Sequence, residues 1–271
     1  MTSSKESRVE RLWSADTYSK NSETQSNHAI PYLNDFIFTG GERVLDIGSG
    51  DGKISNKIAS KLNNGGKILC IDSSIDMINF SRNKFFKVEN MKFIHCKAES
   101  IGWENHFDLV VSFSCLHWIE DQYTVFTNIF NALKNLGNLK VMLYPKCDLL
   151  WKAINQTISA PLWKKYFDTG FFPPYYDYDD FFYKNLLNEI GFCNITSSIS
   201  DTEYVTYPDR SALANFMGAW LPHARNVPSN LEGDFMLNIA ENYTYLSGNR
   251  KNSAVKIPFR KVEVSAKKIS Q

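Results

Sequence analysis

The sequence has almost no excess of either charge. It contains 30 Lys and Arg and 29 Asp and Glu, which gives a net charge of +1 over 271 residues. Proteins that bind nucleic acid usually show a clear basic excess. The balance therefore argues against nucleic acid as a partner. Hydrophobic residues make up 43% and charged residues 22%, which is typical of a folded globular chain and not of a disordered one.

Cysteine is scarce, and its spacing excludes two kinds of site. The five cysteines are an odd number and form no Cys-x-x-Cys pair. Neither a disulfide framework nor a structural zinc site fits that arrangement. Cys70 lies within an apolar run, where a free thiol is expected to behave as a small buried hydrophobic group.

Long hydrophobic runs are also missing. No segment approaches the length of a membrane span, so no membrane partner is expected. The first residues lack the apolar stretch of a secretory signal. A cytoplasmic protein is therefore the expectation. The sequence leaves the oligomeric state open.

Short apolar runs alternate with helix-length polar segments from residue 42 onward. The runs cover residues 44–47, 67–71, 92–95, 109–113, 139–144 and 192–195. Such alternation predicts an α/β fold, a doubly wound, mostly parallel sheet covered on both faces. Residues 255–264 largely alternate apolar and polar side chains, which predicts an antiparallel last strand and seven strands in all.

The rest of the chain is assigned around that sheet, as one domain. Residues 1–41 are expected to form helices that cover a cofactor. Residues 42–145 are expected to form the cofactor-binding half. Residues 146–183, rich in aromatic side chains, and 208–250 are interpreted as helical lid insertions over the strand ends. Residues 184–207 and 251–268 are expected to complete the sheet. Single aromatic residues in a lid can equally serve as core packing.

A glycine turn after the first strand is the strongest local signal. Gly48, Ser49 and Gly50 follow a buried strand and precede a helix, where glycine permits positive φ and lets a ligand touch the backbone. The second strand ends at Asp72. In such folds a carboxylate at this position accepts hydrogen bonds from the hydroxyl groups of a ribose. Asp46 precedes the first glycine by two residues and would repel a pyrophosphate. It therefore favours a cationic cofactor without phosphate, although a structural carboxylate that caps the turn is the alternative.

With these motifs in order, residues 43–145 resemble the S-adenosylmethionine-dependent methyltransferases of the Rossmann-like class. By that resemblance Asp72 binds the ribose hydroxyls, and Ser73 and Met77 flank the adenine. Residues 96–99 match the segment at the adenine edge. Lys97 stands there where many members carry an acid, while the backbone of Ala98 keeps its contact. Glu99 and Ser114 complete the expected cofactor residues.

A narrower resemblance comes from residues 107–119, where the order Ser-Phe-x-Cys-Leu-His-Trp is similar to juvenile hormone acid methyltransferases. More distantly it resembles trans-aconitate methyltransferases and the enzyme that esterifies malonyl carrier protein. These enzymes methylate carboxylates. Tyr18 and Gln25, seven residues apart, fit the same group, in which they lie over cofactor and substrate. The resemblance implies that Gln25 and Trp118 donate hydrogen bonds to a small carboxylic acid, free or tethered to a carrier.

His117 has two interpretations. It could act as a base toward a phenol or amine nucleophile, or it could serve a structural or carboxylate-binding role after the fourth strand. Methylation of another small-molecule nucleophile and a non-catalytic cofactor-binding protein therefore remain as rival functions.

Several methyltransferase classes lack their motifs here. The Asn- or Asp-Pro-Pro-aromatic motif of nucleic-acid amine methyltransferases is absent from residues 112–115, and Ser114 stands where a cytosine C5 enzyme has Pro. Glu120 and Asp121 are adjacent, so they would point apart on a helix and are interpreted as a solvated cap without a metal.

Overall fold

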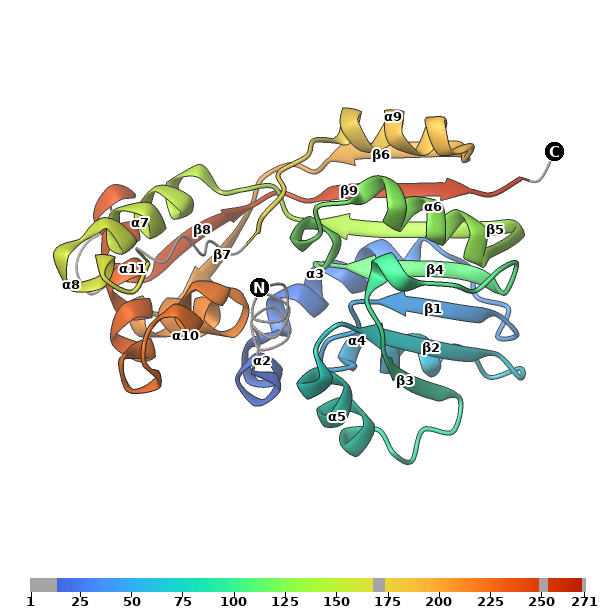
Figure 1. Ribbon diagram of the computed structural model, residues 1–271, viewed down its shortest axis with the longest axis horizontal. Helices are drawn as coiled ribbons and strands as arrows, with labels where there is room; N and C mark the ends of the chain where they lie inside the picture. The colour runs from blue at the N-terminus through green and yellow to red at the C-terminus, as the bar shows by residue number, and fades with distance from the viewer. Residues whose placement is uncertain (1–13, 168–173, 249–252, 270–271) are drawn as a thin grey trace, which may run out of the picture. The chain divides into compact units, whose positions relative to one another are not determined.

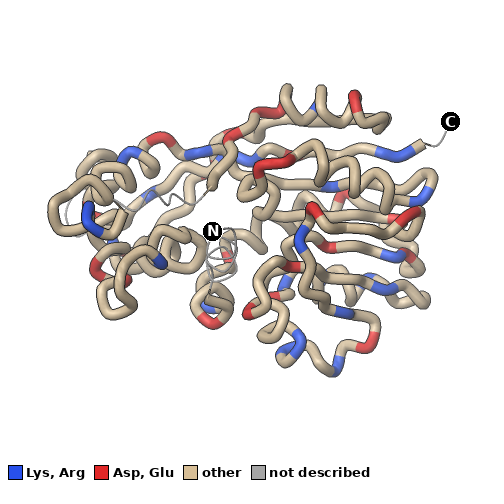
Figure 2. The backbone as a smooth tube through the Cα atoms, viewed as in Figure 1, with Lys and Arg blue, Asp and Glu red and all other residues tan. Residues whose placement is uncertain are grey.

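The computed structural model describes residues 14–167, 174–248 and 253–269. The chain divides into two compact units, which are described separately. The sheet unit comprises Glu23–Pro145, Tyr175–Ser200 and Lys261–Gln271, and the helical unit comprises Met1–Ser22, Lys146–Pro174 and Asp201–Arg260. Lys and Arg are interspersed with Asp and Glu along both units (Figure 2).

The sheet unit is built on seven strands in the order β3-β2-β1-β4-β5-β9-β6 (Figure 1). Their bounds are β1 Arg43–Ile47, β2 Lys67–Asp72, β3 Met91–His95, β4 Phe107–Phe113, β5 Leu133–Leu143, β6 Cys193–Ile199 and β9 Val262–Lys267. The first five strands pair in parallel, and β9 runs antiparallel to both β5 and β6. The predicted fold class, a mostly parallel sheet of seven strands with an antiparallel last strand, is confirmed.

Helices cover both faces of this sheet. They are α3 Glu23–Asn34, α4 Lys53–Ala59, α5 Ile75–Lys84, η1 Ala98–Ser100, η2 Leu116–Trp118, α6 Gln122–Ala132 and α9 Asp180–Ile190. The apolar faces of α3, α4 and α5 pack on one side of the strands, and those of α6 and α9 pack on the other. Burial on both faces explains why the central strands read as almost continuous apolar runs. Cys70 is fully buried among them, as expected.

Side-chain caps start three of the helices at the expected kinds of residue. Ser74 accepts a hydrogen bond from the Met77 N–H at the start of α5, and Asp121 accepts one from Thr124 at the start of α6. Asp179 does the same for α9. Each of these caps satisfies an amide that the helix itself leaves without a partner. The interpretation of Asp121 as a cap is confirmed.

The helical unit packs its own core around helices and a two-stranded sheet. Its elements are α2 Ala15–Asn21, α7 Asp148–Ser159, α8 Pro161–Lys164, β7 Glu203–Tyr207, α10 Arg210–Trp220, η3 Pro222–Asn226, η4 Ser229–Leu231, α11 Glu232–Leu246 and β8 Val255–Phe259. Trp163 and Phe167 are buried against Phe235, so these aromatic residues of the expected lid are core residues of this unit. Phe171 and Phe172 lie outside the described residues.

The prediction of one strand over residues 255–264 is wrong. The segment forms β8, which pairs with β7, and β9, which pairs with β5 and β6. The alternation changes phase between them: Val255 and Ile257 are buried at odd positions, Val262 and Val264 at even ones. Because a shift of one residue turns every side chain to the opposite face, the two halves cannot lie on one sheet as a single regular strand. The strand β7 was not predicted.

None of the helices among the described residues has the length and apolar character that a membrane crossing needs.

Candidate active site at the carboxyl ends of the strands

The glycine turn after β1 is the first part of the site. Gly48 and Gly50 have φ of 73° and 52°, which places both in the left-handed region that favours glycine. The N–H groups of Gly48 and Ser49 both donate to the carbonyl of Ile71, at 2.8 and 3.0 Å. These bonds hold the turn against the end of β2.

The turn after β4 touches Gly48 directly. A Cβ at Gly48 would lie 2.2 Å from the Sγ of Cys115, so no larger residue fits there. Ser114 beside it has φ of 58°, and its N–H donates to the Met142 carbonyl. The β1 and β4 turns therefore form one backbone surface, which only a glycine at position 48 allows.

Two buried hydroxyl groups on this surface lack partners. The Oγ atoms of Ser49 and Ser114 make no hydrogen bond within the part of the chain that the structure describes. Buried polar atoms are almost always hydrogen-bonded, by protein, water or ligand. These two hydroxyls are therefore available to a bound polar molecule, as expected for cofactor-binding residues.

Asp72 lies at the end of β2 and organises both neighbouring turns. Its carboxylate accepts the N–H of Gly50 at 2.9 Å and that of Ser74 at 2.8 Å. Burial raises the pKa of Asp72, against the lowering effect of these two backbone bonds. Asp72 as a whole residue is half-buried, and its carboxylate is the group expected to bind ribose hydroxyls.

The other predicted adenine-side residues lie around Asp72. Met77 is buried on α5, and the carbonyl of Ser73 lies 2.9 Å from Nε2 of His95. The N–H of Cys96 donates to the Asp72 carbonyl at 3.0 Å, which starts the 96–99 segment beside β2. In that segment Ala98 is buried, Lys97 is partly exposed and Glu99 is exposed.

Asp46 is the deepest acid of the site, with 2% of its surface exposed. Its Oδ2 accepts a hydrogen bond from the Ser55 hydroxyl at 2.5 Å, which ties β1 to α4. Burial raises its pKa to about 7, the Ser55 bond opposes that rise, and the charge of Asp72 adds to it. A positive charge nearby would return the carboxyl to its ordinary acidity.

A cluster of aromatic side chains adjoins the β4 turn. His117 and Trp118 lie in η2, with ring centroids 4.8 and 4.9 Å from that of Tyr175. Tyr144, the first residue after β5, lies 6.5 Å from His117 and accepts the Tyr175 hydroxyl at its carbonyl. The backbone carbonyl of His117 accepts the N–H of Tyr176 at 2.8 Å, so the 175–176 segment is fixed to η2.

The imidazole of His117 is a weak base in this cluster. Only 4% of its surface is exposed, and burial lowers its pKa to about 3. The ring is therefore neutral at physiological pH. Its Nδ1 has no hydrogen-bond partner among the described residues.

Helix α3 adds a buried polar stripe to the same unit. The His28 Nδ1 lies 2.8 Å from the Tyr144 hydroxyl, which connects α3 to the aromatic cluster. Gln25 is buried three residues earlier on the same helix face, and its Oε1 has no partner within the described part of the chain.

All the predicted site residues except Tyr18 belong to the sheet unit. Tyr18 lies on α2 in the helical unit, and its contact with a cofactor stays a prediction. His28, Tyr144 and Tyr175 are not among the site residues predicted from the sequence. The i, i+3 spacing of His28 from Gln25 and the place of Tyr144 after β5 were signals available in the sequence.

The comparisons with known proteins agree with this geometry. Residues 38–159 match the family described as "Methyltransferase domain". Juvenile hormone acid O-methyltransferase of Bombyx mori is 26% identical over 82% of this chain and 83% of its own length. The 235L protein of Invertebrate iridescent virus 6, named as a methyltransferase, is 27% identical over 88% of this chain and 87% of its own.

A solved structure supports the fold. The phosphoethanolamine N-methyltransferase 2 of Haemonchus contortus, in complex with S-adenosylhomocysteine, superposes with a TM-score of 0.57 at 19% identity. The match covers 90% of this chain and 53% of that one. From the matched domain, the relatives and this shared fold, the chain carries a methyltransferase domain of the S-adenosylmethionine-dependent type.

Proposed function

We propose that this methyltransferase esterifies a small carboxylic acid with the methyl group of S-adenosylmethionine. The observation that carries the proposal is the cluster of neutral side chains at the carboxyl ends of β4 and β5, in which His117 has a pKa near 3. A carboxylic acid with a pKa of about 4 is already ionised at neutral pH and needs no base. A phenol or an ammonium group would need one, and His117 is a poor candidate.

The cofactor residues fit S-adenosylmethionine, which when bound supplies a methyl group activated by a positively charged sulfur. Asp72 would hold the ribose hydroxyls, with Ser73, Met77 and Ala98 beside the adenine. The close contact of Gly48 with Cys115 brings the β1 and β4 turns together, and their backbone would line the cofactor site. Asp46 would favour the positive charges, since its raised pKa reflects a buried anion that lacks a cation.

The acceptor side needs donors that hold a carboxylate without protonating it. In the proposal the indole N–H of Trp118 and the side-chain amide of Gln25 donate to the acid. The rings of His117, Trp118 and Tyr175 contact one another, and this packing would keep Trp118 in position. Neutral donors in a site that excludes water leave the oxygen nucleophilic, and orientation supplies much of the rate. The Bombyx mori relative is named as an acid O-methyltransferase, and that name supports a carboxylic acid as the acceptor here.

The decisive experiment uses cofactor labelled in its methyl group and a panel of aliphatic, terpenoid and tricarboxylic acids. Label transferred to product that base releases as methanol identifies a methyl ester. Trp118→Phe is expected to lower turnover about 10- to 100-fold, because one orienting donor is lost, with cofactor affinity unchanged. Trp103→Phe, in the connection between η1 and β4, is the matched control.

Two outcomes would overturn the proposal. Base-stable product formed from amines or phenols would replace the carboxylate by another nucleophile. Tight cofactor binding with no transfer to any acceptor would favour a non-catalytic binding protein.

A further inference from the structure

The face of the sheet that α6 and α9 cover is left open near the amino-terminal ends of β1, β2 and β3. The connections after β1, β2 and β4 contain the helices α4, α5 and α6, whereas the connection from β3 to β4 contains only the three-residue turn η1. With so short a connection, the starts of β1 to β3 are not covered by a crossover helix. A cavity of about 370 Å³ lies at this place.

Three cations line this cavity, one from each strand. Arg43 and Lys67 are direct cross-strand partners, and Lys92 pairs with Leu69 on the next strand. Like charges placed side by side on one sheet face destabilise it. All three residues are exposed, and none forms an ion pair within the described part of the chain.

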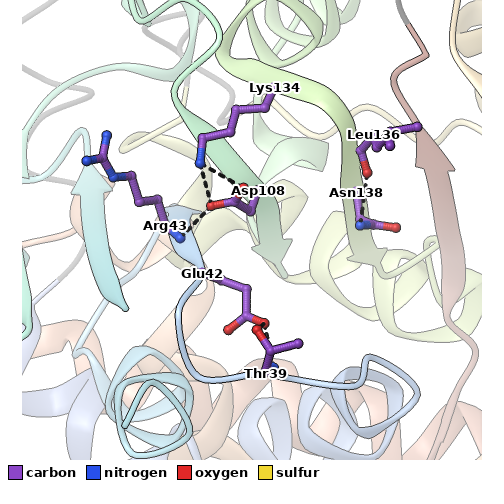
Figure 3. A network of polar contacts seen from close by, with 7 residues as sticks. All are labelled: Thr39, Glu42, Arg43, Asp108, Lys134, Leu136 and Asn138. Atoms are coloured by element: carbon purple, nitrogen blue, oxygen red, sulfur yellow. Dashed lines mark hydrogen bonds and ion pairs between the residues drawn. The ribbon is translucent and has the colours of Figure 1, made fainter. Parts of the chain in front are cut away.

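The carboxylate of Asp108, which contacts the backbone of Arg43, is already engaged by Lys134. Asp108 binds the Lys134 ammonium through both carboxylate oxygens at 2.8 Å and accepts the backbone N–H of Arg43. Figure 3 shows the guanidinium of Arg43 extending away from this carboxylate. Arg43 therefore anchors its backbone to Asp108 and leaves its charge for the cavity.

The wall of the cavity is aromatic. Trp103 and His106 pack edge-on against Phe107, with centroid distances of 5.8 and 4.9 Å. Together with aliphatic side chains of the strands, these rings make the lining largely apolar. A volume of this size suits a small organic molecule, in an apolar pocket with a few polar groups that orient it.

We infer that this cavity, termed the amino-edge groove, binds a small organic anion with a flat apolar body. The anion would lie on Arg43, Lys67 and Lys92, and the apolar body would pack on Trp103 and Phe107. The groove is at the opposite ends of the strands from the glycine turn, because β1 to β4 are parallel. It is therefore a second site, and its existence does not depend on which acceptor the enzyme methylates.

The test uses 2-naphthoate as the probe and calorimetry on the full chain saturated with S-adenosylhomocysteine, so that the cofactor site is filled. Lys67→Glu and Lys92→Glu are each expected to weaken 2-naphthoate binding at least tenfold. Lys57→Glu, an exposed lysine on α4, is the matched control and should change affinity less than twofold. The neutral alcohol 2-naphthalenemethanol should bind more weakly and be insensitive to all three changes.

A second readout follows the aromatic wall. Bound 2-naphthoate should change tryptophan fluorescence in the wild type, and Trp103→Phe should remove that change. Absence of 2-naphthoate binding at millimolar concentration, or equal affinity in the wild type and in Lys67→Glu and Lys92→Glu, would overturn the inference.

Discussion

Along β1 and β2 the charge changes sign from one end of the strands to the other. β1 begins with Arg43 and carries Asp46 near its end, and β2 begins with Lys67 and ends with Asp72. At the carboxyl ends the acids are held by backbone amides and a serine hydroxyl. At the amino ends the cations are exposed. One parallel sheet thus presents an edge suited to a cationic cofactor and an edge suited to an anion.

The difference lies in the connections and not in the strands. Turns that follow β1 and β4 meet at Gly48 and Cys115 and build a closely packed backbone surface. The amino ends are approached by longer segments, of which the one before β4 lacks a full helix. In open α/β sheets, ligands usually bind in the crevice outside the carboxyl ends of the strands, where the strand order reverses.

The largest expected effect comes from crowding the carboxyl edge. Gly48→Ala should displace the turn and weaken S-adenosylmethionine binding about 30-fold or more, since a strained φ and overpacking against Cys115 each cost about 1–3 kcal/mol. Gly65→Ala is the control, because Gly65 also has a positive φ, 78°, but no atom within 4 Å of its added Cβ. Calorimetry and chemical unfolding measure both variants. Equal losses in the two would show that the contact with Cys115 is unimportant.

A charge change at the acceptor should have the next largest effect. Gln25→Glu places an anion where the proposal puts a carboxylate, and the repulsion should raise KM for the acid about 10- to 100-fold. Asn27→Asp adds the same charge at an exposed position of α3 and should leave KM unchanged. Steady-state kinetics with the best acid of the panel measure KM for both variants. An unchanged KM in Gln25→Glu would remove Gln25 from the site.

The acid of β1 should make cofactor binding depend on pH. With a pKa of about 7, Asp46 is mostly ionised at pH 8 and mostly protonated at pH 6. Affinity for the cationic cofactor should therefore fall by up to about tenfold from pH 8 to pH 6. Asp46→Asn should bind more weakly at pH 8 and show a flatter dependence, measured by calorimetry at each pH. A pH dependence as steep as in the wild type would assign the titration to another group.

The same raised pKa of Asp46 also makes the stability of the folded chain depend on pH. Because the pKa of Asp46 is higher in the folded than in the unfolded chain, the folded state binds more protons between about pH 4 and pH 7. The contribution of Asp46 to the free energy of unfolding therefore becomes less favourable as pH rises through this range. Above about pH 7 this loss of stability reaches its full size. Urea unfolding of Asp46→Asn should show a smaller loss of stability from pH 5 to pH 8 than the wild type.

Methyl transfer should be least sensitive to substitutions at the amino-terminal ends of the strands. Lys92→Glu is expected to change kcat and KM for the acid less than twofold, because Lys92 lies at the start of β3 and away from the glycine turn. The assay is the same steady-state measurement. A tenfold change would show that the two edges are coupled and would end the description of them as separate sites.

Much of the carboxyl edge was predictable from local sequence. A buried strand, a glycine turn and an acid at the end of the next strand follow one another within residues 44–72, and each has a direct physical meaning. Helix starts at Ser74, Asp121 and Asp179 are similarly local, because a cap needs only its own first turn. By contrast, the division of residues 255–264 between two sheets depends on partners at least 48 residues away along the chain.

What the sequence by itself determined is the alternation of strands and helices, the glycine turn and the acids Asp46 and Asp72, since these are set by neighbours in the chain. Tertiary structure alone decided that Gly48 faces Cys115, that burial gives His117 a pKa near 3, and that His28 meets Tyr144 across 116 residues. It also placed Arg43 and Lys67 side by side. The physical reason is that packing, desolvation and cross-strand pairing depend on which distant residues are brought into contact.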